Sequence, residues 1–261
     1  MSLVSVGQRL GYRLQTKAAV VRAQIEDRLD GIVIAWLVVA GMASAIRIAF
    51  SHAGQPFGVE TMLPYALLVF APAASLVFAL RWFADGDRQP QPRFRLARIG
   101  RWTEVEREVA RKHRLYGAGG IMVSLMVGML VAVPIRALEY FGSMPAISGP
   151  VPAWLSVLHT MMTLDVVLMT SLYAVAFVAA LRHVPLFPRL LVAIWGLDLA
   201  FQLVTAELVA RTAGLPPEVA NPLQSLLDGN VKKVLISIGL WLPYLLLSRR
   251  VNVTYRSRIP A

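Results

Sequence analysis

The chain contains no cysteine and only four histidines in 261 residues. Without cysteine there is no disulfide, no thiolate nucleophile and no thiolate metal ligand. The histidines form no HExxH motif and no i,i+4 pair, so the sequence predicts no metal site and no bound cofactor. A phosphate-binding glycine loop and a nucleophile elbow are also missing. We therefore expect a protein that is not an enzyme.

Charge is scarce as well, and it is unevenly spread. Charged residues make up 16% of the chain and apolar residues 57%, which is too apolar a balance for an ordinary globular surface. A helix that crosses hydrocarbon needs about 20 mostly apolar residues. Six stretches meet or approach this length: 31–50, 62–83, 117–141, 154–181, 188–210 and 231–248. The expected fold is an all-α polytopic membrane bundle of six transmembrane helices.

The sixth stretch is the weakest of these, because only residues 234–247 are free of charge. It spans the membrane only if Lys232 and Lys233 snorkel outward. Orientation follows from the basic residues, which collect in cytoplasmic loops. With an internal N-terminus, 21 of the 26 Lys and Arg residues fall on the inner side. Both termini are therefore expected in the cytoplasm.

The segments outside the spans divide the chain. Apolar residues of 1–30 recur at helical spacing beside basic ones, which predicts an amphipathic helix lying on the inner leaflet or docked on the protein itself. Two spans follow in 31–83. The basic loop 84–116 should be irregular at first, then helical to about Leu115, because Thr103 and Glu106 have the spacing of a capping box. Residues 117–256 form a four-helix part.

The last span ends abruptly in LWLPYLLLSRRVNVTY, where Arg249 and Arg250 are expected at the cytoplasmic headgroups. This stretch resembles the C-terminal signature of a bacterial membrane-protein family known only as domain-of-unknown-function family 2569. GAGG at 117–120, VP at 133–134 and LFPRL at 186–190 resemble further motifs of that family in order. Ile121 departs from it, since the family usually has Trp there. The resemblance covers about residues 115–256 and implies a bacterial inner-membrane protein, but it supplies no activity.

Two aspartates lie inside apolar spans, where each costs free energy that something must offset. Asp165 and Asp198 both come close to the bilayer midplane at about 1.5 Å per residue, on consecutive helices that could face each other. Three readings stay open: structural carboxylates satisfied by polar neighbours, proton carriers of a small transporter, or the dyad of an intramembrane aspartyl protease. That protease would need Gly-x-Gly-Asp and Tyr-Asp motifs, and the chain has WGLD and TLDV instead.

Other polar residues accompany them. Gln202 and Thr205 share a helical face with Asp198, and His159 is the one histidine inside a span. At the outer ends, we expect local ion pairs between Glu207 and Arg211 and between Arg136 and Glu139. Arg47 belongs to the same outer layer, and these charges could together hold an anionic headgroup. The small residues at 120, 124, 128 and 132 predict a helix-packing seam or, alternatively, a homodimer face.

The net charge of +11 could indicate a nucleic-acid binder, yet anionic lipid headgroups lie nearer to loops of a membrane protein. The basic cluster of the central loop is therefore expected to bind anionic lipids and no nucleic acid; it consists of Arg93, Arg95, Arg98 and Arg101. The partners expected are membrane lipids, with another membrane protein or a second copy as alternatives. The sequence thus favours a non-enzymatic lipid- or partner-binding membrane protein, with a proton-linked transporter as the alternative.

Overall fold

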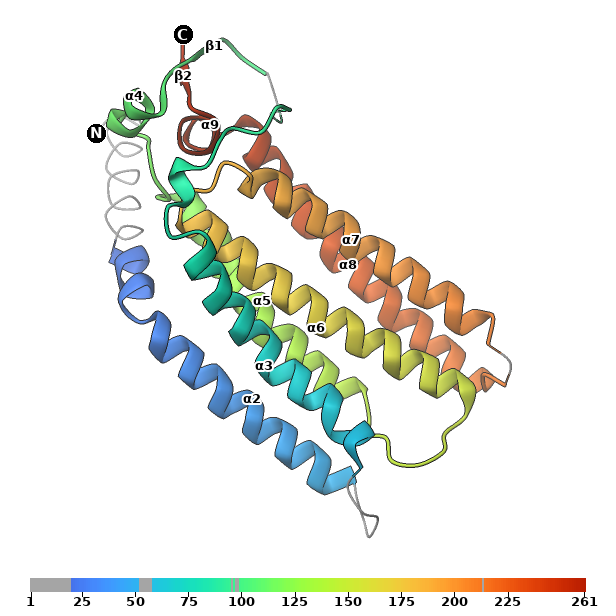
Figure 1. Cartoon of the computed structure of the whole chain (residues 1–261). Coiled ribbons are helices and arrows are strands. Elements are labelled where there is room, and N and C mark those ends of the chain that lie inside the picture. Colours follow the sequence, from blue (N-terminus) through green and yellow to red (C-terminus); the bar gives the residue numbers. More distant parts are fainter. Residues whose placement is uncertain (1–19, 52–57, 95, 97–98, 213) are drawn as a thin grey trace, which may run out of the picture.

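The computed structural model describes residues 20–51, 58–94, 96, 99–212 and 214–261. In these residues, six helices are long and apolar enough to cross a membrane, and they run side by side in alternating directions (Figure 1). They are α2 (Leu29–Ser51), α3 (Val59–Trp82), α5 (Ile121–Ser143), α6 (Ala153–Leu181), α7 (Phe187–Ala210) and α8 (Pro217–Leu247). The expected all-α membrane bundle is confirmed.

Helix α6 lies at the centre of the bundle. Its sequence is apolar around the whole circumference, as is typical of a helix enclosed by others. It packs against α3, α5 and α7, while α2 packs on α3 and α5 and α8 packs on α7. The first two spans and the last four therefore share one core. Helices α5 and α8 flank α6 without packing closely on each other, which leaves a groove between them.

The buried apolar side chains form two clusters. The larger cluster fills the end of the bundle that carries the C-terminus and includes Met169 and Phe177. The smaller one fills the opposite end and includes Tyr140 and Leu158. On α5 the change from one cluster to the other falls between Val133 and Ala137, and on α6 it falls between Met169 and Val166. Polar residues occupy this boundary.

Helix α8 begins earlier than the sequence suggested. The sixth span was expected from residue 231, and the structure begins it at Pro217. Proline suits the first helical position, where its missing N–H costs nothing, and Glu218 favours the positive end of the helix dipole. The helix continues through the polar residues up to Lys233. That lysine therefore lies well inside α8, and its Nζ bonds to Glu139 on α5.

The central loop also differs from expectation. It contains a 3₁₀ turn, η1 (Gly86–Arg88), a strand, β1 (Trp102–Glu104), and a short helix, α4 (Arg107–Lys112). Strand β1 pairs antiparallel with β2 (Arg258–Pro260), with Thr103 opposite Ile259. Because Thr103 lies in a strand, it cannot cap a helix; α4 starts after Glu106, without a side-chain cap. The predicted capping box is wrong. The expected short helix is present, but it ends at Lys112 instead of about Leu115.

The chain does not leave the protein after α8. Ser248 ends α8 and is also the N-cap of the next helix, α9 (Arg249–Arg256). Its side-chain hydroxyl accepts a hydrogen bond from the backbone N–H of Val251. Residues 251–256 are buried although most are polar. Arg256 donates to Asn252 Oδ1 at 3.0 Å and to the Leu245 carbonyl at 2.9 Å. Burial and the neighbouring Arg258 lower the pKa of Arg256 to about 10.

Two of the motifs that carry the family resemblance meet at this end of the bundle. The backbone N–H of Gly117 donates to Thr254 Oγ1 at 3.0 Å, and Arg250 Nη1 donates to the Gly117 carbonyl at 3.1 Å. A Cβ at Gly119 would lie 3.0 Å from Arg250 Nη1, so a larger residue there would require the guanidinium to shift by a few tenths of an ångström. Tyr255 also donates to the Ala180 carbonyl at 2.8 Å. The GAGG segment at 117–120 is thus in direct contact with α9.

The amphipathic N-terminal segment lies partly outside the described residues, which begin at Val20. Residues 20–27 are helical and lead into α2. Val21, Ile25 and Leu29 are the members of the predicted apolar stripe that lie among the described residues. Of these, Ile25 and Leu29 pack against the larger core cluster. This part of the segment is docked on the protein, one of the two arrangements that the sequence left open.

The paired arginines at the end of α8 provide a test of this arrangement. Arg250 binds the carbonyls of Leu115 and Gly117, whereas Arg249 is exposed. We expect Arg250→Gln to lower the free energy of unfolding by about 1–3 kcal/mol, because charged donors to buried acceptors are lost. Arg249→Gln, the matched control, should change it by about 0.5 kcal/mol or less. Thermal unfolding in detergent micelles compares the two; equal effects would contradict the buried position of α9.

Candidate functional site

Three charged side chains from three helices meet inside the bundle. Arg136 on α5 donates through Nη1 to Asp165 Oδ2 on α6 at 3.4 Å, and through Nη2 to Asp198 Oδ2 on α7. The side chain of Asp198 is fully buried, and those of Asp165 and Arg136 are 9% and 19% exposed. Tyr173 places its ring 5.6 Å from the guanidinium carbon. The guanidinium of Arg136 therefore binds both of the aspartates that were predicted from the sequence as candidate site residues.

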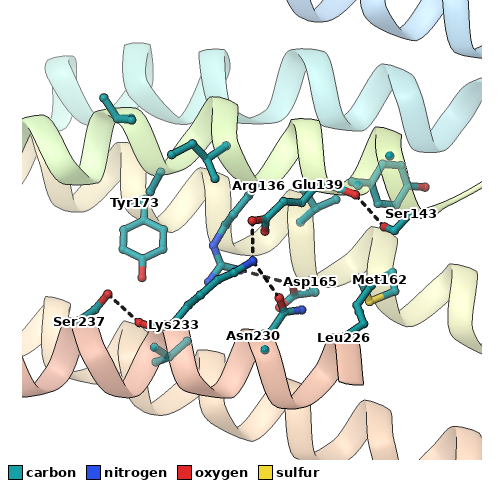
Figure 2. A pocket seen from close by; sticks show the side chains of 18 of the residues that line it. Arg136, Glu139, Ser143, Met162, Asp165, Tyr173, Leu226, Asn230, Lys233 and Ser237 are labelled. Carbon is teal, nitrogen blue, oxygen red and sulfur yellow. Dashed lines mark hydrogen bonds and ion pairs between the residues drawn. The ribbon is translucent and has the colours of Figure 1, made fainter. Parts of the chain in front are cut away.

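Further hydrogen bonds extend this cluster into a ring over four helices. Gln202 on α7 donates to Asp165 Oδ1 at 3.3 Å and accepts from Asn230 on α8 at 3.3 Å. Lys233, one turn further along α8, lies 3.5 Å from Asn230 Oδ1 and 2.5 Å from Glu139 Oε1 on α5. We call these residues the polar ring: Arg136, Glu139, Asp165, Asp198, Gln202, Asn230 and Lys233. Figure 2 shows Lys233 reaching across from α8 to α5.

The polar ring lies along a groove of about 720 Å³ between α5 and α8, with α6 as its floor. Its walls are mostly apolar and include the exposed side chains of Val131 and Ile135. Arg136, Glu139, Asp165, Asn230 and Lys233 line it, whereas Asp198 lies behind Arg136, outside the lining. The groove thus combines apolar walls with charged side chains inside the span. Membrane proteins usually keep such costly charges in the bundle interior or beside a cavity.

Glycines border this space. A Cβ added at Gly128 or Gly142 on α5, or at Gly229 on α8, would meet nothing within 4 Å. Gly128 and Ser124 are exposed, so the predicted packing seam on α5 is wrong. The face of α5 that packs inside the bundle carries larger residues, Met122, Met126 and Met129. Small residues on the other face keep the groove open.

Several predicted site residues lie elsewhere. Arg136 and Glu139 were expected to pair with each other, but Arg136 binds two aspartates and Glu139 binds Lys233, because inward-pointing partners on other helices are in reach. Thr205 is buried on the same face of α7, outside the ring. His159 lies 3.3 Å from Tyr140 Oη, which is itself 2.7 Å from Thr163 Oγ1. This forms a separate polar group between α5 and α6.

The outer charges do not converge on one site. Arg47 donates through Nε and Nη2 to the carbonyl of Met144, at 3.2 and 3.0 Å, and ties α2 to the connection after α5. Arg211 and Glu207 form the expected i,i+4 pair at 2.6 Å, exposed to solvent. Of the basic cluster in the central loop, Arg93 and Arg101 are exposed, and Arg95 and Arg98 lie outside the described residues.

Sequence reasoning missed Tyr173, Asn230 and Lys233. Tyr173 lies on α6 eight residues after Asp165, close to the same helical face. Asn230, Lys233 and Ser237 follow one another at spacings of three and four, which is one face of a helix. This polar stripe could have been recognised in the sequence. The charge-free run begins only at residue 234, after Asn230 and Lys233, so hydrophobic length alone starts the span too late to include them.

The arrangement suits binding better than hydrolysis. A catalytic aspartyl dyad needs two carboxylates that share a proton. Here a guanidinium lies between the carboxylates of Asp165 and Asp198 and binds both. The groove instead offers guanidinium, ammonium, amide and phenol groups beside apolar walls, which is the composition of a site for an amphiphile.

No protein-family model matches this chain, and no curated protein or solved structure matches it. The resemblance to domain-of-unknown-function family 2569 therefore stays a prediction from the motifs. The six membrane-spanning helices indicate an integral, multi-pass membrane protein.

The shared guanidinium of Arg136 should contribute more to the free energy of unfolding than the exposed guanidinium of Arg211. Arg136→Gln leaves two carboxylates without a counter-charge in the interior, so we expect a loss of about 3–5 kcal/mol in the free energy of unfolding. Arg211→Gln, which breaks the exposed pair with Glu207, should cost about 0.5 kcal/mol or less. Unfolding by increasing fractions of sodium dodecyl sulfate measures both variants. An Arg136→Gln protein as stable as the unmodified one would exclude the ion pairs.

Proposed function

We propose that this protein is a non-enzymatic, multi-pass protein of the bacterial inner membrane that binds a membrane lipid in the groove between α5 and α8. The observation that carries the proposal is the groove itself, about 720 Å³ in volume, with apolar walls and the polar ring along part of its length. An acyl chain suits the apolar walls, since it loses no contact with hydrocarbon there. A polar headgroup suits the ring, because buried polar groups need hydrogen-bond partners.

The depth of the ring is compatible with a lipid. Arg136 precedes the last residue of α5, Ser143, by seven residues, which corresponds to about 10 Å along the helix. The headgroup would therefore enter the groove from the end of the bundle opposite the C-terminus. With both termini in the cytoplasm, as the distribution of Lys and Arg favours, this end faces the outer leaflet.

The opposite end of the bundle has a different role in this proposal. It carries the exposed Arg93 and Arg101 of the central loop. Basic side chains beside a membrane are attracted to the anionic lipids of the cytoplasmic leaflet, by about 1 kcal/mol for each residue near the surface. This surface would fix the orientation of the bundle, and the groove would select the ligand.

Filling the groove tests the proposal. Gly128→Phe places a ring in open space of the groove, and Gly239→Phe places one on an exposed position of α8 outside it. We expect Gly128→Phe to weaken the tightest bound phosphatidylglycerol by about tenfold or more, which corresponds to about 1.4 kcal/mol. Gly239→Phe should bind as the unmodified protein does. Native mass spectrometry of delipidated protein, titrated with phosphatidylglycerol, counts the bound lipids.

Unfolding measurements on both phenylalanine variants establish that they are folded. Equal binding by the two folded variants and the unmodified protein would refute the groove as a lipid site.

A further inference from the structure

The polar ring holds more negative than positive charge. It contains three carboxylates, from Glu139, Asp165 and Asp198, and two cations, Arg136 and Lys233. One negative charge is therefore left over when all five groups are ionised. In an apolar surrounding such an excess costs several kcal/mol, so the site favours any process that adds a positive charge.

The carboxylate furthest from the groove has unused capacity. Asp198 is fully buried and does not line the groove. Its Oδ2 accepts from Arg136, whereas its Oδ1 is buried and has no partner of good hydrogen-bond geometry among the described residues, with Gln202 as its polar neighbour. No headgroup reaches this oxygen from the groove while Arg136 stands in front of it. A proton is small enough to bind there.

The groups that face the groove itself are mainly donors. Lys233 is the most accessible charge of the ring, 58% exposed, and Arg136 is reached from the same side. Asn230 and Tyr173 add an amide and a phenol. Glu139 is the accessible acceptor, and it is paired with Lys233. Asp165 is nearly buried and already accepts from Arg136 and Gln202. Guanidinium and ammonium groups together bind phosphate.

These two features are coupled through charge. A phosphate headgroup that binds Arg136 and Lys233 brings one negative charge into a site that already carries an excess one. Its entry also draws Arg136 away from the aspartates, which leaves them less well compensated. If one proton from water binds to the aspartate pair as the phosphate enters, the net charge of the site stays unchanged.

Resting on the proposed function, we infer that the groove binds an amphiphile with an anionic phosphate headgroup and that Asp165 and Asp198 take up one proton when it binds. The phosphate oxygens accept hydrogen bonds from Arg136 and Lys233, and the proton joins a carboxylate oxygen; no covalent bond of the ligand changes. Among the described residues, further titratable groups near the cluster are Glu139 and Tyr140 on α5, His159 and Tyr173 on α6, and Tyr65 on α3, whose ring lies 6.2 Å from that of Tyr140.

The sign of the pH dependence follows from linkage. Because the liganded protein carries one more proton than the free protein, binding becomes tighter as the pH falls. For one proton the dissociation constant falls by at most about tenfold for each unit of pH. An uncharged amphiphile brings no charge and needs no proton, so its affinity should not depend on pH.

The experiment uses the full-length, delipidated protein in detergent and two probes with identical acyl chains, phosphatidylglycerol and diacylglycerol. Isothermal titration calorimetry between about pH 5 and pH 8 gives the affinities, and repetition in buffers of different ionisation enthalpy gives the number of protons taken up. We expect phosphatidylglycerol to bind more tightly at low pH with uptake of about one proton. Diacylglycerol should bind without either effect.

Variants identify the groups. In Asp165→Asn/Asp198→Asn the two carboxyl groups that would take up the proton are absent, and the site carries one net positive charge. Phosphatidylglycerol should therefore bind this variant with little dependence on pH. His159→Gln removes the imidazole that the described residues place nearest the site, and it should keep the pH dependence of the unmodified protein. Because the measurement of proton uptake needs no variant, the inference stays testable if the double variant does not fold.

The outcomes separate the two proposals. If neither probe binds, or if Gly128→Phe leaves binding unchanged, the proposed function fails and the inference fails with it. If phosphatidylglycerol binds in the groove with no proton uptake at any pH, the inference is overturned and the proposed function stands. Tighter binding of phosphatidylethanolamine without proton uptake would also overturn it, because the ammonium of that lipid would then supply the positive charge.

Discussion

The guanidinium of Arg136, which two carboxylates share inside an apolar bundle, determines how the central helices pack. An isolated charge at this depth costs several kcal/mol, and the cost is offset only when partners lie within hydrogen-bond distance. Asp165 and Asp198 supply these partners from α6 and α7. The positions of α5, α6 and α7 relative to one another are therefore fixed by polar contacts as well as by the packing of methionine and aromatic side chains.

The groove lies beside the same polar layer, where α5 and α8 do not pack closely on each other. Large residues on α5 point into the core, and glycines on its other face leave room beside α8. Among the described residues, the bond from Lys233 to Glu139 is the one side-chain hydrogen bond that joins α5 to α8. Helix α8 is otherwise held by α7 and by α9. A site bounded by two helices with so few mutual contacts can admit a bulky ligand from the side.

The sequence predicts the spans well because hydrophobic length is a local property. It also predicts that Asp165 and Asp198 matter, because a carboxylate within an apolar run is conspicuous in any sequence. It does not predict their partner, because an arginine near the end of an apolar run is equally compatible with the membrane surface. The long side chain of Arg136 reaches inward from the last third of α5, and only the packing of three helices decides this direction.

Long-range pairing accounts for the other differences. Strands β1 and β2 have three residues each and lie more than 150 positions apart, so no local sequence pattern predicts their pairing. The polar sequence of α9 is typical of a solvated tail, yet its side chains are buried because backbone carbonyls at the end of α8 and around Gly117 accept from its arginines. Helix propensity depends on the local sequence, so it carries no information about acceptors in distant segments.

The central claim is that Arg136 and Asp198 stabilise the bundle through each other. A double-mutant cycle of Arg136→Gln and Asp198→Asn, followed by unfolding in sodium dodecyl sulfate, tests it most directly. We expect the double variant to be more stable than the sum of the single losses implies, by about 2 kcal/mol. Losses that simply add would contradict it, since the two side chains would then act independently.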